Sequence, residues 1–224
     1  MKQFFVMFLL LAAGLAGSAV AQNEQAPIVS KEFEYKNWTF SNVKGEGESS
    51  LRDLAAGKKL TLVVYFAPWC PNWRHDVEFV RDLYDKYSAK GLQVVGVGEY
   101  DPLSSIQEHV AKFKLTFPIV YESALRTDKQ KTTHYQYRLA AGDTRNWGSP
   151  WYVFIEPANV QPTGEVFVKK ANVVNGELMR DDVEKFIREK LELDKGKPKP
   201  QASLAKADGT GPCEPAGVSN LIKP

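Results

Sequence analysis

Cysteine and histidine are scarce in this chain, which contains only two cysteines, Cys70 and Cys213, and three histidines among 224 residues. His75, His109 and His134 show no spacing typical of metal ligands; we place the first two on helix surfaces and His134 in a loop or helix. The sequence also lacks a glycine-rich phosphate loop and a Ser–His–Asp order. These absences argue against a metal site, a phosphate-binding loop and a serine hydrolase, and we expect no cofactor.

A large charge excess is also absent, since the formal net charge is only +2. Part of that excess lies in Lys2 and in lysines scattered among proline and glycine after residue 195, so the middle of the chain is mildly acidic. A mildly acidic domain gives no electrostatic reason to expect nucleic acid as a partner.

Long apolar runs are missing except near the N-terminus. Lys2 precedes an apolar run over residues 4–15, and Ala19-Val20-Ala21 offers a small-x-small cleavage site. This pattern predicts a signal peptide over residues 1–21 and a periplasmic or extracellular protein with no stable membrane anchor after cleavage. The alternative is an uncleaved anchor, for which the run is short. No cysteine lies near the cleavage site, which excludes lipid attachment there.

The remaining chain divides by composition. Residues 22–32 are polar and predict a loose leader, and residues 33–194 have enough apolar content for one core. Residues 195–224 are rich in lysine, proline, alanine and glycine, which predicts a disordered tail.

The chain is organised around a predicted strand-to-helix junction. Residues 60–66 form a run of apolar and β-branched residues, as in a fully buried strand. A helix is expected to begin at Pro71, whose missing N–H suits the first turn, and to end near Gly91. Cys70 therefore lies at a helix N-terminus, where unpaired N–H groups and the positive end of the dipole favour a thiolate.

Residues 65–71, which read Tyr-Phe-Ala-Pro-Trp-Cys-Pro, resemble the active-site segment of thioredoxin-like proteins. The similarity is greatest to exported thiol–disulfide oxidoreductases of the TlpA and ResA type and to AhpC/TSA relatives. That family normally carries Cys-X-X-Cys, whereas Trp73 occupies the resolving-cysteine position here. Val64 likewise stands where thioredoxins place a buried Asp. The resemblance implies an α/β fold with a central mixed sheet, flanking helices and an N-terminal strand or hairpin extension.

A second motif, Ser149-Pro150, precedes the apolar residues 151–155 and resembles the cis-proline segment that faces the active-site cysteine in this family. The resemblance implies a cis bond that turns the backbone of residue 149 toward the thiol, ready to pair with an extended substrate. The alternative is an ordinary trans proline at a strand start.

Periodicity and resemblance predict the other elements. They are an edge strand or hairpin arm over 33–40, a strand over 92–98, a helix capped by Ser104 whose end and the start of a short strand fall within 114–121, a helix within 132–139, a long loop over 140–147, a hairpin over 151–170, and a final helix capped by Asp181 or Asp182.

The two cysteines leave several interpretations open. The helix N-terminus, Arg74 one turn on and partial exposure favour a reactive Cys70; the alternative is a relic that the fold tolerates. A lone nucleophile needs a second thiol to resolve its mixed disulfide. Cys213 lies about twenty residues beyond the last helix, and a coil of that length spans about 25 Å, so distance does not exclude pairing with Cys70. The alternatives are an incidental or an intermolecular tail cysteine.

The main hypothesis is an exported thiol–disulfide oxidoreductase that acts through a single active-site cysteine, Cys70. In it, Ser149-Pro150 positions the partner backbone, and Trp69, Pro71 and Trp73 shape an apolar docking face. Its partners are a protein thiol or disulfide substrate and an external reductant or resolving thiol.

Other hypotheses come from different functional classes. The first is a non-catalytic thioredoxin-like module that holds a peptide or protein in the same groove, with Trp73 as an anchor. The second is an AhpC/TSA-type peroxidase, although Ala67 and Val63 stand where peroxiredoxins carry Thr or Ser and Pro. Copper-delivery relatives use Cys-x-x-x-Cys, and here Arg74 stands at the second ligand position.

Overall fold

The computed structural model describes residues 24–195. The chain divides into two compact units after Leu193, and every element below belongs to the first. The predicted signal peptide and Cys213 lie outside the described residues.

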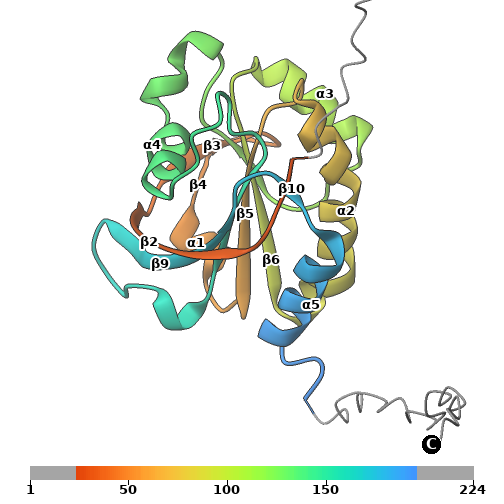
Figure 1. The fold of residues 1–224 in the computed structure, drawn as a ribbon. Coiled ribbons are helices and arrows are strands. Elements are labelled where there is room, and N and C mark those ends of the chain that lie inside the picture. The colour runs from red at the N-terminus through yellow and green to blue at the C-terminus, as the bar shows by residue number, and fades with distance from the viewer. Residues whose placement is uncertain (1–23, 196–224) are drawn as a thin grey trace, which may run out of the picture. The chain divides into compact units, whose positions relative to one another are not determined.

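Eight strands form one mixed sheet in the order β2-β9-β8-β5-β6-β7-β3-β4 (Figure 1). The central strand β5 pairs in parallel with β6 and antiparallel with β8. The strands are β2 (Val29–Lys36), β3 (Thr39–Asn42), β4 (Glu48–Ser50), β5 (Leu60–Phe66), β6 (Leu92–Gly98), β7 (Ile119–Tyr121), β8 (Trp151–Ile155) and β9 (Val166–Val174). The predicted α/β fold with a central mixed sheet is therefore confirmed.

Helices and short elements cover the sheet (Figure 1). A separate parallel pair joins β1 (Gln25–Ala26) to β10 (Glu177–Leu178). The helices are α1 (Leu51–Ala55), α2 (Pro71–Tyr87), α3 (Leu103–Lys112), α4 (Thr133–Ala140) and α5 (Arg180–Lys190), with short 3-10 segments η1 (Ser88–Lys90), η2 (Arg126–Lys131) and η3 (Pro157–Asn159). None of the helices between residues 24 and 195 has the length and apolar character that spanning a bilayer requires.

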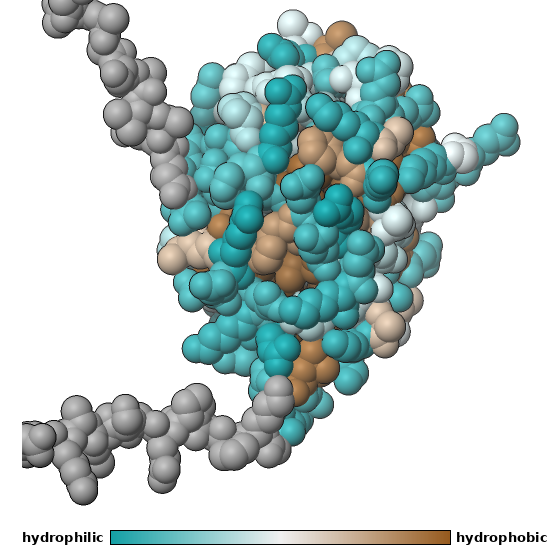
Figure 2. Space-filling view, turned by 90° about the vertical axis from the view of Figure 1, so that its right-hand side faces the viewer, coloured by the Kyte–Doolittle hydropathy of each residue, from teal (hydrophilic) through white to brown (hydrophobic). Residues whose placement is uncertain are grey.

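Two apolar clusters lie on opposite faces of the sheet, because successive side chains of a strand point to opposite sides. Val64 and Phe66 of β5 pack with residues of α2, α3 and α5. Val63 and Tyr65 pack with residues of β2, α1 and α4. The face carrying α2, α3 and α5 is mainly hydrophilic outside, with apolar side chains visible between polar ones, as amphipathic helices require (Figure 2).

The N-terminal extension differs from the expected single strand or hairpin arm over residues 33–40. Those residues divide between β2, which pairs with β9, and β3, which pairs with β4 and β7 near the other edge. Only Asn37 and Trp38 separate the two strands. Trp38 is buried in the cluster that contains Val63 and Tyr65, so this short crossing covers one face of the sheet. β2 is an edge strand of the sheet, as predicted, whereas the division of these residues into two strands was not foreseen.

Most predicted boundaries agree with the structure. The helix α2 begins at Pro71, and Gly91 adopts a left-handed φ of 108° directly after η1. Thr132 caps α4 through its side chain, which accepts a hydrogen bond from the Tyr135 N–H. The strand β6 has the predicted limits.

Two predicted helix caps are wrong. Helix α3 begins earlier, after Pro102, so Ser104 lies inside its first turn. Met179 precedes α5, and Asp181 and Asp182 lie in its first turn. Carboxylates in a first turn interact favourably with the helix dipole without capping through a side chain, which explains why the sequence pattern resembled a cap.

Candidate functional site

Cys70 is the N-terminal boundary residue of α2, with φ −72° and ψ 123°. Pro71 follows as the first helical residue, as its fixed φ predicts. The Cys70 side chain makes no capping hydrogen bond and is only 6% exposed. The thiol is therefore more deeply enclosed than the expected partial exposure.

The two sequence motifs meet at this thiol. The Cys70 Sγ donates a hydrogen bond to the Ser149 carbonyl oxygen at 3.0 Å. The Ser149 hydroxyl accepts a hydrogen bond from the Ala67 N–H at 3.0 Å, and the Ser149–Pro150 peptide bond is cis. The predicted cis bond and the orientation of residue 149 toward the thiol are both present, so a strand end, a helix start and the proline loop converge on one sulfur.

Trp73, which stands in the position of a resolving cysteine, is fully buried. Its ring lies 4.8 Å from that of Phe66, and its Nε1 donates a hydrogen bond to His109 Nε2 at 2.8 Å. A fully buried indole offers no surface to a partner, so its predicted place in a docking face is wrong. The space left by the missing thiol is filled from within by core packing.

His109 is buried instead of lying on a helix surface, which corrects its predicted position. Burial first, and then the cations Arg74 and Lys112, lower its pKa to about 4. An indole N–H only donates, so His109 Nε2 must be the acceptor and the ring proton sits on Nδ1. The sequence showed only helical spacing for His109, and its contact with Trp73 arises when α2 packs beside α3.

The partly exposed aromatic surface near Cys70 comes from Trp69 and Trp147, whose ring centroids lie 5.2 Å apart at an interplanar angle of 80°. The Arg126 guanidinium lies 4.2 Å from the Trp69 ring centroid, and the Lys129 ammonium lies 4.9 Å from that of Trp147. We name these four residues the tryptophan–cation patch. Trp147 belongs to the loop singled out for its length, but no sequence signal marked it as a neighbour of Trp69.

One buried arginine fixes the loop before the cis-proline. Arg138 is 1% exposed, and its guanidinium donates hydrogen bonds to the carbonyl oxygens of Asp143, Arg145 and Asn146 at 3.1, 2.7 and 3.1 Å. Gly148 has φ 61°, and a Cβ there would lie 2.5 Å from Arg138 Cδ. Only glycine combines that conformation with that close approach, so Arg138 and Gly148 together set the path into Ser149.

His134 supports the same loop from behind. Its Nε2 donates to the Gly148 carbonyl oxygen at 3.2 Å, and its Nδ1 accepts from the Tyr100 hydroxyl at 2.8 Å. Its ring stacks on Tyr65 at 5.0 Å. Complete burial lowers the pKa of His134 well below its usual value, so the ring is neutral.

Tyr100 connects this support to the patch. Its φ of 59° lies in the left-handed region, which is costly for a bulky side chain. Its N–H donates to the Ser123 hydroxyl at 2.9 Å, and its carbonyl accepts from Trp69 Nε1 at 3.3 Å. The conformation at the carboxyl end of β6 thus fixes the orientation of Trp69.

Two buried carboxyl groups were not foreseen from the sequence. Asp76 in α2 accepts hydrogen bonds from the Tyr152 hydroxyl and the Leu178 N–H, both at 2.8 Å, and burial raises its pKa. Glu99 accepts from the Ser123 hydroxyl at 2.5 Å, and burial, with Glu122 nearby, raises its pKa well above the usual value. Val64, at the position of the family's buried Asp, is a core residue.

Two further observations concern the surroundings of Cys70: the contact made by Arg74 and the arrangement of potential metal ligands. Arg74 Nε donates a hydrogen bond to the Pro68 carbonyl oxygen at 2.9 Å, which ties it to the segment before Cys70. Among residues 24–195, no cluster of three or more His, Cys, Asp or Glu side chains is arranged to hold a metal ion.

A mixed sheet, a cysteine at the start of α2 and a cis-proline against its sulfur define the thioredoxin-like class of thiol proteins. The Redoxin family model matches residues 22–175, so the chain belongs to the Redoxin family. A curated relative is the thiol-disulfide oxidoreductase ResA of Oceanobacillus iheyensis, 20% identical over 75% of this chain and 70% of the relative. The ResA of Halalkalibacterium halodurans is 30% identical, over 36% of this chain and 45% of its own length. The matching segment therefore spans less than half of that second relative.

Solved structures agree on the fold. A thiol:disulfide interchange protein of the thioredoxin family from Chlorobium tepidum superimposes with a TM-score of 0.50 and 17% identity, over 72% of this chain and 97% of that one. A DsbF homologue from Corynebacterium diphtheriae gives a TM-score of 0.51 and 14% identity, over 71% and 92% of the two chains. The chain thus has the thioredoxin-like fold of these proteins.

Proposed function

We propose that the protein is an exported thiol–disulfide oxidoreductase that acts through the single active-site cysteine Cys70. The observation that carries the proposal is the 3.0 Å contact between the Cys70 sulfur and the carbonyl oxygen of Ser149. It brings the thiol to the backbone that leads into the cis-proline, where an extended partner chain would lie beside the sulfur. Membership of the Redoxin family and the names of the ResA relatives support the same activity.

The proposed reaction is thiol–disulfide exchange. The deprotonated Cys70 sulfur attacks one sulfur of a partner's disulfide, forming a mixed disulfide while the second partner sulfur leaves as a thiolate. A second thiolate must then attack the Cys70–partner bond, because Trp73 occupies the resolving position. That second thiol comes from an external reductant or from Cys213, which lies outside the described residues.

The partner is proposed to approach over the tryptophan–cation patch. Trp69 and Trp147 are only partly buried and offer apolar contact, while Pro150 and the Ser149 backbone position the reacting segment. Because Cys70 is 6% exposed, the sulfur reacts with a protein disulfide only when side chains around it move aside.

The test measures how fast the Cys70 thiol attacks a small disulfide. The reduced protein is mixed with 5,5′-dithiobis(2-nitrobenzoate), and the rate of thionitrobenzoate release and the modified residue are measured against pH. We expect Cys213→Ser to retain a rapid phase that Cys70→Ser lacks, and mass spectrometry to locate the adduct on Cys70. A Cys70 that reacts no faster than a free thiol at any pH contradicts the proposal.

A second candidate is a non-catalytic binding module, and the variant Cys70→Ser distinguishes it from the oxidoreductase. The burial of the thiol and the replacement of the usual resolving cysteine by Trp73 favour the module. A module predicts that Cys70→Ser retains function, whereas the oxidoreductase predicts that this variant loses it.

Export is a proposal that rests on residues 1–21, which the structure does not describe. Lys2, the apolar run and the Ala19-Val20-Ala21 site support a cleaved signal peptide. Fractionation of expressing bacterial cells should find a protein whose N-terminus is Gln22 in the exported fraction. An uncleaved N-terminus in the membrane fraction would indicate the anchor instead.

A further inference from the structure

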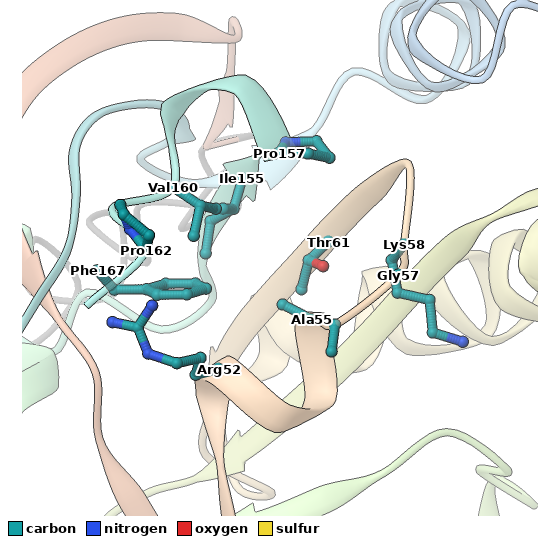
Figure 3. Close-up of a pocket in the computed structure, with 11 residues that line it drawn as sticks. Arg52, Ala55, Gly57, Lys58, Thr61, Ile155, Pro157, Val160, Pro162 and Phe167 are labelled. Atoms are coloured by element: carbon teal, nitrogen blue, oxygen red, sulfur yellow. The ribbon is translucent and has the colours of Figure 1, made fainter.

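A hollow of about 360 Å³ lies beside Thr61 at the start of β5, whereas Cys70 follows the other end of that strand (Figure 3). Its walls come from α1, β8, η3 and the start of β9. They are mostly apolar, formed by Ala55, Ala56, Ile155, Pro157, Val160, Pro162 and Phe167. Its size and lining are those of a small-molecule site.

Few polar side chains enter this hollow, and none of them is acidic. Thr61 is 2% exposed, yet its hydroxyl forms no hydrogen bond with any residue in the described part of the chain. Figure 3 draws that hydroxyl among the lining side chains. Thr61 Oγ1 is not among the fully buried polar atoms that lack a partner in the described residues, so this hydroxyl keeps contact with the hollow and can bond to a ligand there.

Arg52 is held in place at one wall. Its guanidinium donates to the carbonyl oxygens of Gln161 and Gly164 at 2.5 and 3.1 Å and lies 5.0 Å from the Phe167 ring centroid. These bonds use only part of its five N–H donors. The charge is thus fixed beside the hollow before any ligand arrives.

Lys58 supplies a second cation at the rim. Within residues 24–195, neither Arg52 nor Lys58 forms an ion pair with a carboxylate. Two cations that form no ion pair within the described residues, next to apolar walls, match a ligand with one negative group and an apolar body.

We propose that this hollow binds a small organic monocarboxylate with an apolar body of several carbons. The carboxylate bonds to the Thr61 hydroxyl and interacts with Arg52 and Lys58, and the apolar body packs against Val160, Phe167 and the neighbouring walls. The site is separate from Cys70, and its occupancy does not depend on the proposed thiol chemistry.

The test uses hexanoate as the probe and 1-hexanol as its neutral counterpart, each titrated into the ¹⁵N-labelled protein and followed by NMR. We expect hexanoate to shift the amide resonances around Thr61, Val160 and Phe167 in a saturable way, and hexanol to bind at least fivefold more weakly. The unchanged remainder of each spectrum reports that the fold is retained.

Two variants and a control make the result specific. Thr61→Val keeps the shape of the side chain without its hydroxyl, and Lys58→Gln removes the rim charge; each is expected to weaken hexanoate binding about three- to tenfold. Lys170→Gln, on the exposed surface of β9, should bind like the unmodified protein. The proposal is overturned by unshifted amides at 20 mM hexanoate, by equal binding of hexanol, or by unchanged affinity in both site variants.

Discussion

Trp73 places a buried indole where related proteins carry the reactive second cysteine of the Cys-X-X-Cys motif. Its hydrogen bond to His109 and its contact with Phe66 make the second half of the usual Cys-X-X-Cys motif part of the core. A thioredoxin-like scaffold thereby keeps the first sulfur of the motif at the start of α2 without any partner sulfur on the same helix.

Trp73→Phe tests this packing. The variant keeps an aromatic ring but leaves His109 Nε2 without its donor, so we expect a loss of about 1–3 kcal/mol in the free energy of unfolding. Urea denaturation measures the change. Trp147→Phe, at a partly exposed site, is the control and should cost less than about 1 kcal/mol. Equal costs would show that the buried hydrogen bond contributes nothing.

Gly148 and Gly45 allow the cost of close packing to be separated from the cost of backbone conformation. Both have positive φ, 61° and 80°. A Cβ added at Gly148 would lie within 3 Å of Arg138, whereas one added at Gly45 would meet no atom of the described chain that close. Replacing either with Ala incurs the left-handed backbone penalty. We expect Gly148→Ala to cost about 2 kcal/mol more than Gly45→Ala, because Arg138 is buried and cannot move aside. Chemical denaturation of both variants measures the difference, and similar costs would contradict the close packing.

At the scale of elements, α4 acts as a clamp on the proline loop through Arg138. Arg138→Lys keeps the charge but loses the planar group that reaches three carbonyl oxygens. We expect amide hydrogen exchange in residues 143–148 to accelerate at least tenfold, with little change in β5 and β6. Arg81→Lys, on the surface of α2, serves as the control. Unchanged exchange in the loop would show that other contacts hold it.

Elements with a strong local pattern were predictable, whereas contacts between distant elements were not. The apolar runs of β5 and β6, Pro71 at the start of α2 and Gly91 after it each have a local physical cause. The site behind Ser149 depends on Tyr100, His134 and Arg138, which long chain separations hide from any single stretch of sequence. Their buried polar groups satisfy one another only after the sheet is assembled.

At the scale of the whole molecule, buried titratable groups determine how stability varies with pH. His109 and His134 have lowered pKa values in the folded state, so the unfolded chain binds more protons as the pH falls below about 6.5 and stability is lost. Glu99 has a raised pKa, so the folded chain retains its proton longer and stability is lost as the pH rises above its unfolded value of about 4.5.

Glu99→Gln isolates the loss of stability that ionisation of Glu99 causes as the pH rises. The amide oxygen still accepts from Ser123 but cannot ionise, so the variant should gain stability relative to the unmodified chain as the pH rises above about 4.5. The gain is at most about 1.4 kcal/mol per pH unit, until the folded pKa of Glu99 is reached. Denaturation at pH 4 to 8 measures it, with exposed Glu46→Gln as a control. A constant difference across this range would contradict the raised pKa.

The pairing of β2 with β9 also determines when the N-terminal strand can find its partner during synthesis. Val29 lies opposite Val173, so the first long strand has no partner until nearly the whole domain has left the ribosome. At ordinary translation speeds that interval is on the order of ten seconds. During it, a nascent chain carries Tyr35 and Trp38 uncovered, available to chaperones. Completion of the last long strand is thus the event that provides the N-terminal strand with its partner.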